Sequence, residues 1–266
     1  MELQTLRIES AAGTAAADGI RVLTLRRPDV MNAMNTQMFT DLREALHRLA
    51  FEDGLRALVI AGEGGRAFSA GGDLKERNGM SDDAWRRQHQ LLEEVFLAVK
   101  DFPLPVIAAV EGHAHGGGCE LALMADFIIA STTAVFSLAE VKRGIMPGGG
   151  GIQNLVRAAG MRRAKQLIFT GDAFSAAEAA GWGVVNDVVE AGQALGAAIA
   201  IARRIVAAAP MSVRYAKLAA SRGGEVDFHT GYMLDIAAYN ALVPTEDRRE
   251  GVLAFNERRP PVWSNR

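Results

Sequence analysis

PVIAAVEGHAHGGGCE, at residues 105–120, joins an apolar segment to three consecutive glycines and a glutamate. Residues 106–110 are apolar throughout and lie between Pro105 and Gly112, which predicts a strand covered on both faces. Residues 121–124 are good helix formers, so the glycines are expected at or just before the N-terminus of a helix. The sequence therefore predicts a buried strand, a turn and a helix start in immediate succession.

The start of this helix is the first candidate for chemistry. A first helical turn leaves backbone N–H groups without internal partners, at the positive end of the helix dipole. Glycine lets a ligand approach those groups closely. Gly117 and Glu120 are three residues apart, so on a helix they share a face. An N–H group and a carboxylate would then face one place, which suits a reaction that builds negative charge on an oxygen.

Strand and helix patterns alternate in the first part of the chain. We expect strands over 3–9, 20–26, 55–61, 126–131, 134–137 and 184–189, the first two forming a hairpin. Helices are expected over 36–50, with Thr36 as the cap, and over 81–100. This alternation predicts an α/β fold in which helices pack on sheets.

Helical patterns dominate after residue 152, over 194–208, 211–220, 226–241 and 246–258. No stretch rich in serine and proline separates this part from the rest. We therefore predict one functional domain, with a core over residues 1–195 and a helical C-terminal region over residues 196–266.

Composition and charge argue against several classes of function. The chain has 266 residues and a net charge of −2, so no global basic field points to nucleic acid or to an acidic membrane surface. No apolar run approaches the ~18 residues of a membrane span, and residues 1–10 lack the apolar region of a secretory signal. Cys119 is the single cysteine, which excludes an internal disulfide and makes a cytoplasmic location the expectation.

Two further segments could carry a site, and each has a structural alternative. AFSAGGDLK at 67–75 could present an N–H group to a ligand oxygen, or its glycines could simply supply a turn. The glycines at 148–151 could form another helix start with free N–H groups, or could let a helix and a strand pack closely. Glu140 lies among apolar neighbours, which favours partial burial of a side chain that is usually solvated.

A metal site and a serine triad are both disfavoured. His113, His115, Cys119 and Glu120 lie close together, but their spacing does not match HExxH, and no second cluster of Cys and His follows. No GxSxG segment occurs that would place a nucleophilic serine. We expect no metal, and we expect the histidines to be structural or to line a pocket.

Five segments together resemble the enoyl-CoA hydratase/isomerase (crotonase) superfamily over essentially the full chain. They are RPDVMNAM from Arg27, AFSAGGDLKE from Ala67, GHAHGGGCELAL from Gly112, FSLAEVKRGIMPGGGG from Phe136 and TEDRREGVLAFNERRPP from Thr245. Each segment alone is a weak signal, but in this order they are specific. The resemblance implies a spiral of repeated ββα units with a helical C-terminal region used in trimerisation, and hence a homotrimer or a dimer of trimers.

The resemblance also implies roles for individual residues. The N–H groups of Ala70 and Gly117 would form an oxyanion hole for the carbonyl of an acyl-CoA thioester, and two such donors stabilise the enolate-like transition state. Glu120 and Glu140 align with the two glutamates that hold the attacking water in the hydratase branch, and the N–H of Gly148 aligns with a third group that touches this water. The pair of glutamates favours reversible hydration of a trans-2-enoyl-CoA to a 3-hydroxyacyl-CoA.

Coenzyme A is part of the substrate in this resemblance, so no separate cofactor is expected. The resemblance implies that three segments contact it. The loop formed by Ala70, Gly71, Gly72, Asp73 and Leu74 would receive the adenine through backbone groups, and Asp29, Val30 and Met31 would line the path of the CoA chain. Phe255 and Arg258 would reach the nucleotide part of a CoA bound to an adjacent subunit.

Three positions depart from the family pattern. His115 stands where an apolar residue is usual, Asp29 where a basic residue is common, and Arg258 where lysine is more common. Arg258 should keep the attraction to phosphate with a changed geometry. His115 could retune the acyl pocket towards a polar or branched substrate.

Two other functions stay open at the level of the sequence. Δ3–Δ2 isomerisation, or another reaction on the same enolate platform, is the nearest alternative, because one scaffold hosts several chemistries. A non-catalytic or RNA-binding role would require a Lys-rich helix face. In the segment 36–50, however, Arg43 and Arg48 are interspersed with Asp41 and Glu44.

Overall fold

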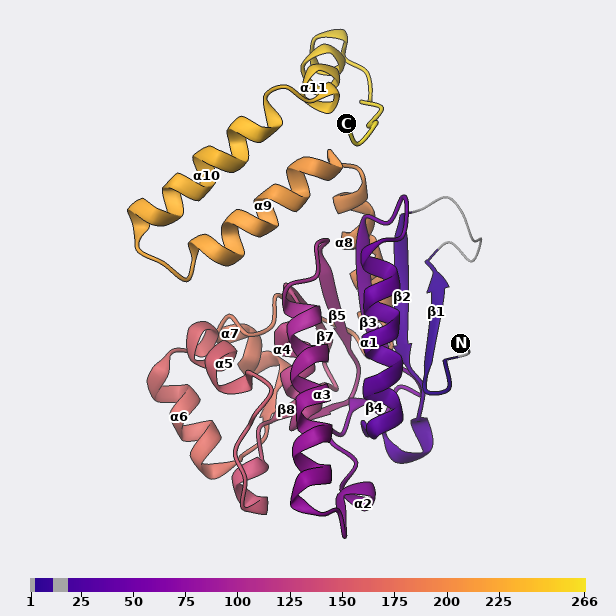
Figure 1. Cartoon of the computed structure of the whole chain (residues 1–266), viewed down its shortest axis with the longest axis vertical. Coiled ribbons are helices and arrows are strands. Elements are labelled where there is room, and N and C mark those ends of the chain that lie inside the picture. Colours follow the sequence, from indigo (N-terminus) through magenta and orange to yellow (C-terminus); the bar gives the residue numbers. More distant parts are fainter. Residues whose placement is uncertain (1–2, 12–18) are drawn as a thin grey trace.

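A computed structural model of the chain describes residues 3–11 and 19–266. Two sheets form its centre, helices lie around them, and a helical arm near the C-terminus projects from one end (Figure 1). This is the α/β architecture predicted from the alternating patterns, and it agrees with a spiral of strand–strand–helix units.

The larger sheet has six strands within the described residues, in the order β1-β2-β3-β5-β7-β10. β1 and β2 are antiparallel, and every later pair of neighbours is parallel. Their bounds are β1 (Leu6–Ser10), β2 (Ile20–Leu25), β3 (Ala57–Gly62), β5 (Val106–Val110), β7 (Phe127–Ser131) and β10 (Asp187–Val189). The predicted hairpin is confirmed, although its connection over 12–18 lies outside the described residues. The strand predicted over 184–189 forms only in its last three residues.

The smaller sheet has four strands in the described part of the chain, in the order β4-β6-β8-β9. They are β4 (Ala67–Ser69), β6 (His113–His115), β8 (Val135–Ser137) and β9 (Phe174–Ser175). β4, β6 and β8 each follow a strand of the larger sheet after a short turn, which gives the chain its repeated strand–strand step. Gly112 makes one of these turns with φ +60°, and a Cβ there would lie 2.1 Å from the carbonyl oxygen of Arg66. Only glycine fits such a position.

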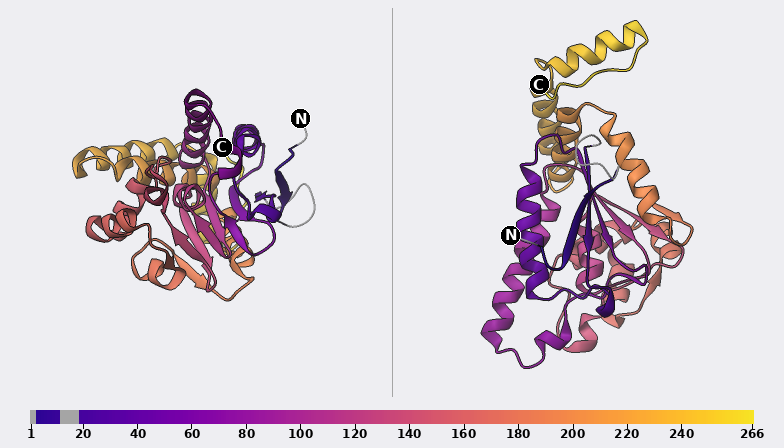
Figure 2. Two further views of the ribbon diagram at one scale, coloured as in Figure 1. Left: turned by 90° about the horizontal axis from the view of Figure 1, so that it is seen from below. Right: turned by 90° about the vertical axis from the view of Figure 1, so that its right-hand side faces the viewer.

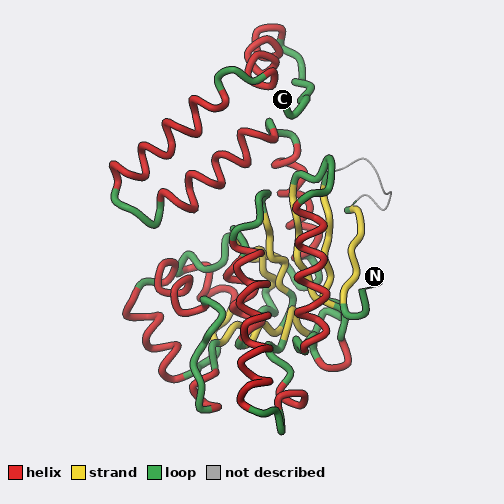
Figure 3. Tube along the Cα trace, in the orientation of Figure 1, coloured by secondary structure: helices red, strands yellow, loops and turns green. Residues whose placement is uncertain are grey.

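Helices cover both faces of the larger sheet, and Figure 3 shows them outside the strands. α1 (Thr36–Ala50) buries Phe39, Leu42 and Leu46 in the main core. α8 (Ala194–Val206) covers the other face with Ala194, Ala198 and Ala202, packed with residues such as Val59, Ile107 and Ile129. A parallel sheet buried on both faces explains the continuous apolar run of β5.

The cap of α1 differs from the prediction by one residue. Asn35 is the N-cap, and its side-chain oxygen accepts a hydrogen bond from the N–H of Met38 at 3.0 Å. Thr36 is already the first helical residue. Asparagine and threonine are both good caps, so the sequence alone did not separate them.

The remaining elements connect these layers. They are η1 (Pro28–Val30), α2 (Leu74–Arg77), α3 (Asp82–Lys100), α4 (Gly117–Met124), η2 (Glu140–Arg143), α5 (Gly151–Ala159), α6 (Met161–Thr170) and α7 (Ala176–Gly181). α4 and α5 both start at glycines, as the sequence predicted, and neither start has a side-chain cap.

The arm consists of α9 (Pro210–Gly223), α10 (Phe228–Leu242) and α11 (Glu246–Glu257), and Figure 2 shows from other directions how it stands off the sheets. α9 and α10 pack closely where Gly223 meets Gly231, because a Cβ on Gly231 would lie 3.0 Å from the carbonyl oxygen of Gly223. Large apolar side chains of the arm are exposed, among them Phe228, Tyr232, Met233, Tyr239, Leu253 and Phe255.

Within residues 3–11 and 19–266, no single helix has the length and apolarity of a membrane span. Only α8 and α9 taken together, bent by 111° at their junction, pass that test.

Candidate active site

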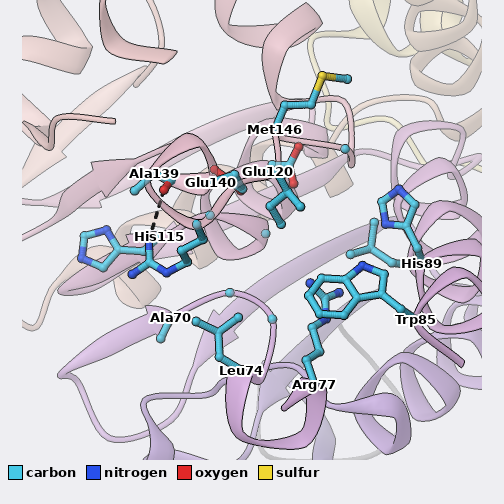
Figure 4. Close-up of a pocket in the computed structure, with 18 of the residues that line it drawn as sticks. Ala70, Leu74, Arg77, Trp85, His89, His115, Glu120, Ala139, Glu140 and Met146 are labelled. Atoms are coloured by element: carbon cyan, nitrogen blue, oxygen red, sulfur yellow. Dashed lines mark hydrogen bonds between the residues drawn. The ribbon is translucent and has the colours of Figure 1, made fainter. Parts of the chain in front are cut away.

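A cavity of about 870 Å³ opens where the starts of α2, α4 and η2 meet α3. Figure 4 shows Glu120, Glu140 and Met146 on one side of it and Arg77, Trp85 and Leu74 on the other. Its walls combine glycine backbone, the carboxyl groups of Glu93, Glu120 and Glu140, and a cluster of larger side chains. The predicted site residues among its lining are Met31, Ala70, Gly71, Gly72, Leu74, Gly117, Glu120, Glu140 and Gly148.

Glu120 lies in the first turn of α4 and is only 3% exposed. Its Oε1 accepts hydrogen bonds from the N–H groups of Gly149 at 2.8 Å and Gly151 at 3.0 Å. These N–H groups belong to the start of α5. The start of α5 therefore binds the carboxyl group of Glu120, which lies in the first turn of α4. Burial and the Glu140 carboxylate raise the pKa of Glu120 to about 7, against the opposing effect of the two N–H donors.

Glu140 is the first residue of η2 and lines the same cavity. Its Oε2 is buried and has no hydrogen-bond partner among the described residues. Burial raises the pKa of Glu140 as well, although Arg143 and Arg77 act to lower it. Glu120 and Glu140 are therefore two acids in one partly desolvated space, and one of them offers an oxygen that no described group occupies.

Two backbone N–H groups line this space, that of Gly72 in the loop before α2 and that of Gly117 at the start of α4. Gly117 is the first residue of α4, whose start has no side-chain cap. The nitrogen of Gly72 is 3.8 Å from the position that a Cβ on Gly117 would take, so the two backbones are adjacent. Neither N–H donates to the backbone of a described residue. The pair can therefore donate to one oxygen placed in the cavity.

The prediction that Ala70 supplies one of these N–H groups is wrong for this conformation. The Ala70 N–H donates to the carbonyl oxygen of Met31 at 2.9 Å. It is thus already engaged, although Ala70 lines the cavity. Gly72, two residues further along the same loop, has the free N–H beside Gly117.

The other residues predicted to bind CoA fall into three groups. Met31, Gly71 and Leu74 line the cavity. Asp73 has a structural role: it forms an ion pair with Arg27 at 2.9 Å, and it caps α2 by accepting hydrogen bonds from two backbone N–H groups. Asp29 and Val30 form η1 and lie outside the cavity lining.

Phe255 belongs to α11 and Arg258 is the C-cap of that helix, which lies at the opposite end of the molecule from α2 (Figure 1). Both are exposed, Phe255 by 83%. Within one chain they do not reach the cavity, so the prediction that they serve an adjacent subunit stays a prediction.

His115 lines the cavity, as expected for one of the histidines. Its Nδ1 is 2.7 Å from Ser137 Oγ, and its Nε2 is 3.1 Å from His113 Nδ1. Burial, followed by the charges of His113 and Arg143, lowers the pKa of His115, which favours a neutral ring at neutral pH. Among the described residues no group of three or more His, Cys, Asp or Glu is arranged to hold a metal ion.

The sequence analysis singled out neither Arg77 nor His89, and both line the cavity together with Trp85. His89 packs so closely on Gly148 that a Cβ there would lie 2.7 Å from the imidazole. These residues come from α2 and α3, and their signal in the sequence is only a helical pattern with polar residues, which does not tell a pocket wall from a solvated face.

Comparison with known proteins gives a consistent result. The family model described as "Enoyl-CoA hydratase/isomerase" matches residues 15–266. Human mitochondrial methylglutaconyl-CoA hydratase is 39% identical over 249 residues, covering 92% of this chain and 74% of that protein. The short-chain-enoyl-CoA hydratase of Clostridium acetobutylicum is 37% identical over 259 residues, covering 97% of each chain. A crystal structure of an enoyl-CoA hydratase from Bacillus anthracis superposes with a TM-score of 0.95 at 38% identity, covering 99% of this chain and 100% of that one.

Proposed function

The chain belongs to the enoyl-CoA hydratase/isomerase family, and on that premise we propose that it adds water reversibly to a trans-2-enoyl-CoA, giving a 3-hydroxyacyl-CoA. One observation carries this assignment: Glu120 and Glu140 line the same cavity beside the free N–H groups of Gly72 and Gly117. The addition of water needs an acid and a base around one water molecule. This cavity supplies both beside the two backbone N–H groups, which we call the anion site.

The two backbone N–H groups act on the thioester. As the oxygen of water bonds to Cβ, electrons move through the double bond onto the thioester oxygen, which becomes enolate-like. Gly72 and Gly117 donate to that oxygen, and preorganised donors stabilise it more in the transition state than in the bound substrate. Loss of one such donor costs about 3–4 kcal/mol of barrier.

The two glutamates handle the protons. Two acids in one desolvated space do not both ionise readily, so the pair holds one proton between its carboxyl groups. The ionised member takes a proton from water as its oxygen bonds to Cβ, and the protonated member gives its proton to Cα. The product gains one water, and the pair still holds one proton, with the acid and base roles exchanged.

CoA is a part of the substrate, and the proposed mechanism uses no separate cofactor. We propose that Met31, Gly71, Gly72 and Leu74 guide the CoA chain into the cavity, because all four line it. Phe255 and Arg258 would contact the nucleotide from a neighbouring subunit. The exposed apolar side chains of the arm support a homotrimer or a dimer of trimers, since a patch of this kind is typical of an interface between proteins.

A cytoplasmic location stays part of the proposal and rests on the single, unpaired and buried Cys119. Fractionation of the source cells tests it directly.

The activity is tested with purified protein, crotonyl-CoA and longer enoyl-CoA homologues, by following the loss of absorbance of the conjugated thioester. Turnover of at least one chain length is the expected result. Turnover of a 3-enoyl-CoA that survives the change Glu120→Ala, with no hydration of any 2-enoyl-CoA, would instead identify an isomerase, because moving a double bond requires a single base.

A further inference from the structure

Arg77, the last residue of α2, places a guanidinium in the wall of the acyl cavity opposite the two glutamates (Figure 4). Its Nε donates to Gln88 Oε1 at 2.7 Å. Its Cζ lies 4.7 Å from the centroid of the Trp85 ring. Its Nη2 is buried and has no hydrogen-bond partner among the described residues.

The position of this guanidinium is fixed by its neighbours. Gln88 is 4% exposed, and its Nε2 donates to Thr36 Oγ1 at 2.8 Å and to Glu76 Oε2 at 2.7 Å. The amide is therefore oriented before any ligand arrives, and it holds Arg77 in turn. The Trp85 ring covers one face of the guanidinium, an arrangement that favours a cation at this place. On another side, a Cβ at Gly72 would come within 3.1 Å of Cζ.

A buried cationic donor without a partner is costly, so it indicates a missing acceptor. Arg77 forms no ion pair with Glu120, Glu140 or another described carboxylate within 4.0 Å, although Glu76, Glu120 and Glu140 all stabilise its charge from further away. Arg77 therefore interacts with the two acids only through its charge, and its Nη2 still lacks a hydrogen-bond acceptor among the described residues.

The geometry points to an occupant of matching chemistry. A guanidinium binds a carboxylate through parallel N–H···O bonds, which are among the strongest hydrogen bonds in proteins. Near Glu120 and Glu140 a substrate carboxylate would be repelled. Three arginines line the cavity, but Arg86 and Arg143 are exposed and already donate to Asp83 and to the carbonyl oxygen of Ala139. Arg77 has the buried donor without a partner, so the favourable place for a carboxylate is beside Arg77 and Trp85. We propose that the natural substrate is a short enoyl-CoA whose acyl chain ends in a carboxylate, and that Arg77 binds this carboxylate. This specifies the substrate class of the hydratase proposed above and rests on it.

The first experiment compares two substrates of similar size. One is the CoA monothioester of pent-2-enedioic acid, and the other is 5-methylhex-2-enoyl-CoA, in which a branched methyl pair replaces the carboxylate. The wild-type protein should hydrate the carboxylated substrate with a higher kcat/KM. Arg77→Met should lower that kcat/KM by about 30-fold and change the value for the neutral substrate by less than about threefold. Arg77→Lys, which keeps the charge without the fork of donors, should fall between the two.

Arg43→Met is the matched control, because Arg43 is an exposed arginine of α1 that pairs with Glu94 outside the cavity. It should leave both substrates unaffected. Equal losses on both substrates in Arg77→Met would overturn the proposal and would mean that Arg77 acts only by tuning the glutamates. A wild-type protein that prefers the neutral substrate would overturn it as well.

Measuring the binding of analogues that cannot react tests the role of Arg77 separately from the hydratase activity. The Kd values of the saturated analogues, the CoA monothioester of pentanedioic acid and 5-methylhexanoyl-CoA, are measured by calorimetry on the wild type and on Arg77→Met. A preference for the carboxylated analogue that disappears in Arg77→Met supports the role of Arg77 even where no hydration occurs. Equal Kd values in the wild type reject that role even where hydration is fast.

Discussion

Glu120 is destabilising when ionised, because its burial raises its pKa from 4.5 to about 7. Between these two pH values the folded chain keeps a proton that the unfolded chain releases, so stability falls as pH rises through this window. At about 1.4 kcal/mol per pKa unit, the cost approaches about 3 kcal/mol above pH 7. A buried charge of this kind is a feature of active sites rather than of optimised cores.

The change Glu120→Gln should therefore stabilise the protein in a pH-dependent way. Glutamine keeps the oxygen that accepts from Gly149 and Gly151 but carries no charge. Urea unfolding at pH 8 should show the variant more stable than the wild type by about 2–3 kcal/mol, and unfolding at pH 4.5 should show little difference. An equal difference at both pH values would mean that the pKa of Glu120 is not raised.

The shared proton also sets the pH dependence of the reaction. The pair is active with one proton and inactive with two or with none, so kcat/KM should follow a bell-shaped curve. Because the pKa of Glu120 is raised to about 7, the alkaline limb should begin near pH 7, and the acid limb should lie below it, where Glu140 also becomes protonated. A rate that keeps rising from pH 6 to pH 9 would contradict this assignment.

At the scale of elements, the anion site depends on close contact between α4 and β4. A Cβ at Gly118 would lie 2.1 Å from the carbonyl oxygen of Ser69, a backbone atom that cannot move aside. Gly118→Ala should destabilise the fold by about 3 kcal/mol and shift the Gly117 N–H away from Gly72. Thermal or urea unfolding gives the first effect, and kcat gives the second.

Gly196→Ala is the matched control for this change. Gly196 lies within α8 and is exposed, and nothing lies within 4 Å of the place where its Cβ would go. The substitution should stabilise the fold by about 0.5–1 kcal/mol, since alanine favours a helix more than glycine does. If both alanine variants unfolded alike, the close contact at Gly118 would have no special importance.

The sequence predicted the longer elements well, because their patterns extend over several residues. β5 and the start of α4 lie where the apolar run and the glycines placed them. β4, β6 and β9 were missed, since strands of two or three residues are too short to show an alternation.

Site residues were predictable where a side chain carries the chemistry or where a helix start exposes an N–H group. Glu120 and Glu140 stand out in the sequence, as does the helix start at Gly117, and the structure brings all three to one cavity. The second free backbone N–H did not stand out: whether Ala70 or Gly72 has it depends on the Met31 carbonyl, which comes from a different loop. Arg77 was missed for a similar reason, because its unused Nη2 results from contacts with α3.

For the whole molecule, the exposed apolar surface of the arm is the main feature that one chain does not explain. Phe228 is 78% exposed at the start of α10. Analytical sedimentation should show the wild type as a trimer or a multiple of three, and Phe228→Asp should shift it towards smaller species. Phe169→Asp on α6, where the side chain is 71% exposed, should leave the assembly unchanged. A monomeric wild type would reject the proposed assembly.

Glu140 offers the most direct test of hydration as the activity of this protein. The wild type should hydrate crotonyl-CoA or a short homologue. Glu140→Gln should lower kcat by at least about 100-fold and leave KM within about threefold, since the change removes proton transfer and not the CoA contacts. A variant with the kcat of the wild type, or a wild type that hydrates no enoyl-CoA of any chain length, would contradict the account.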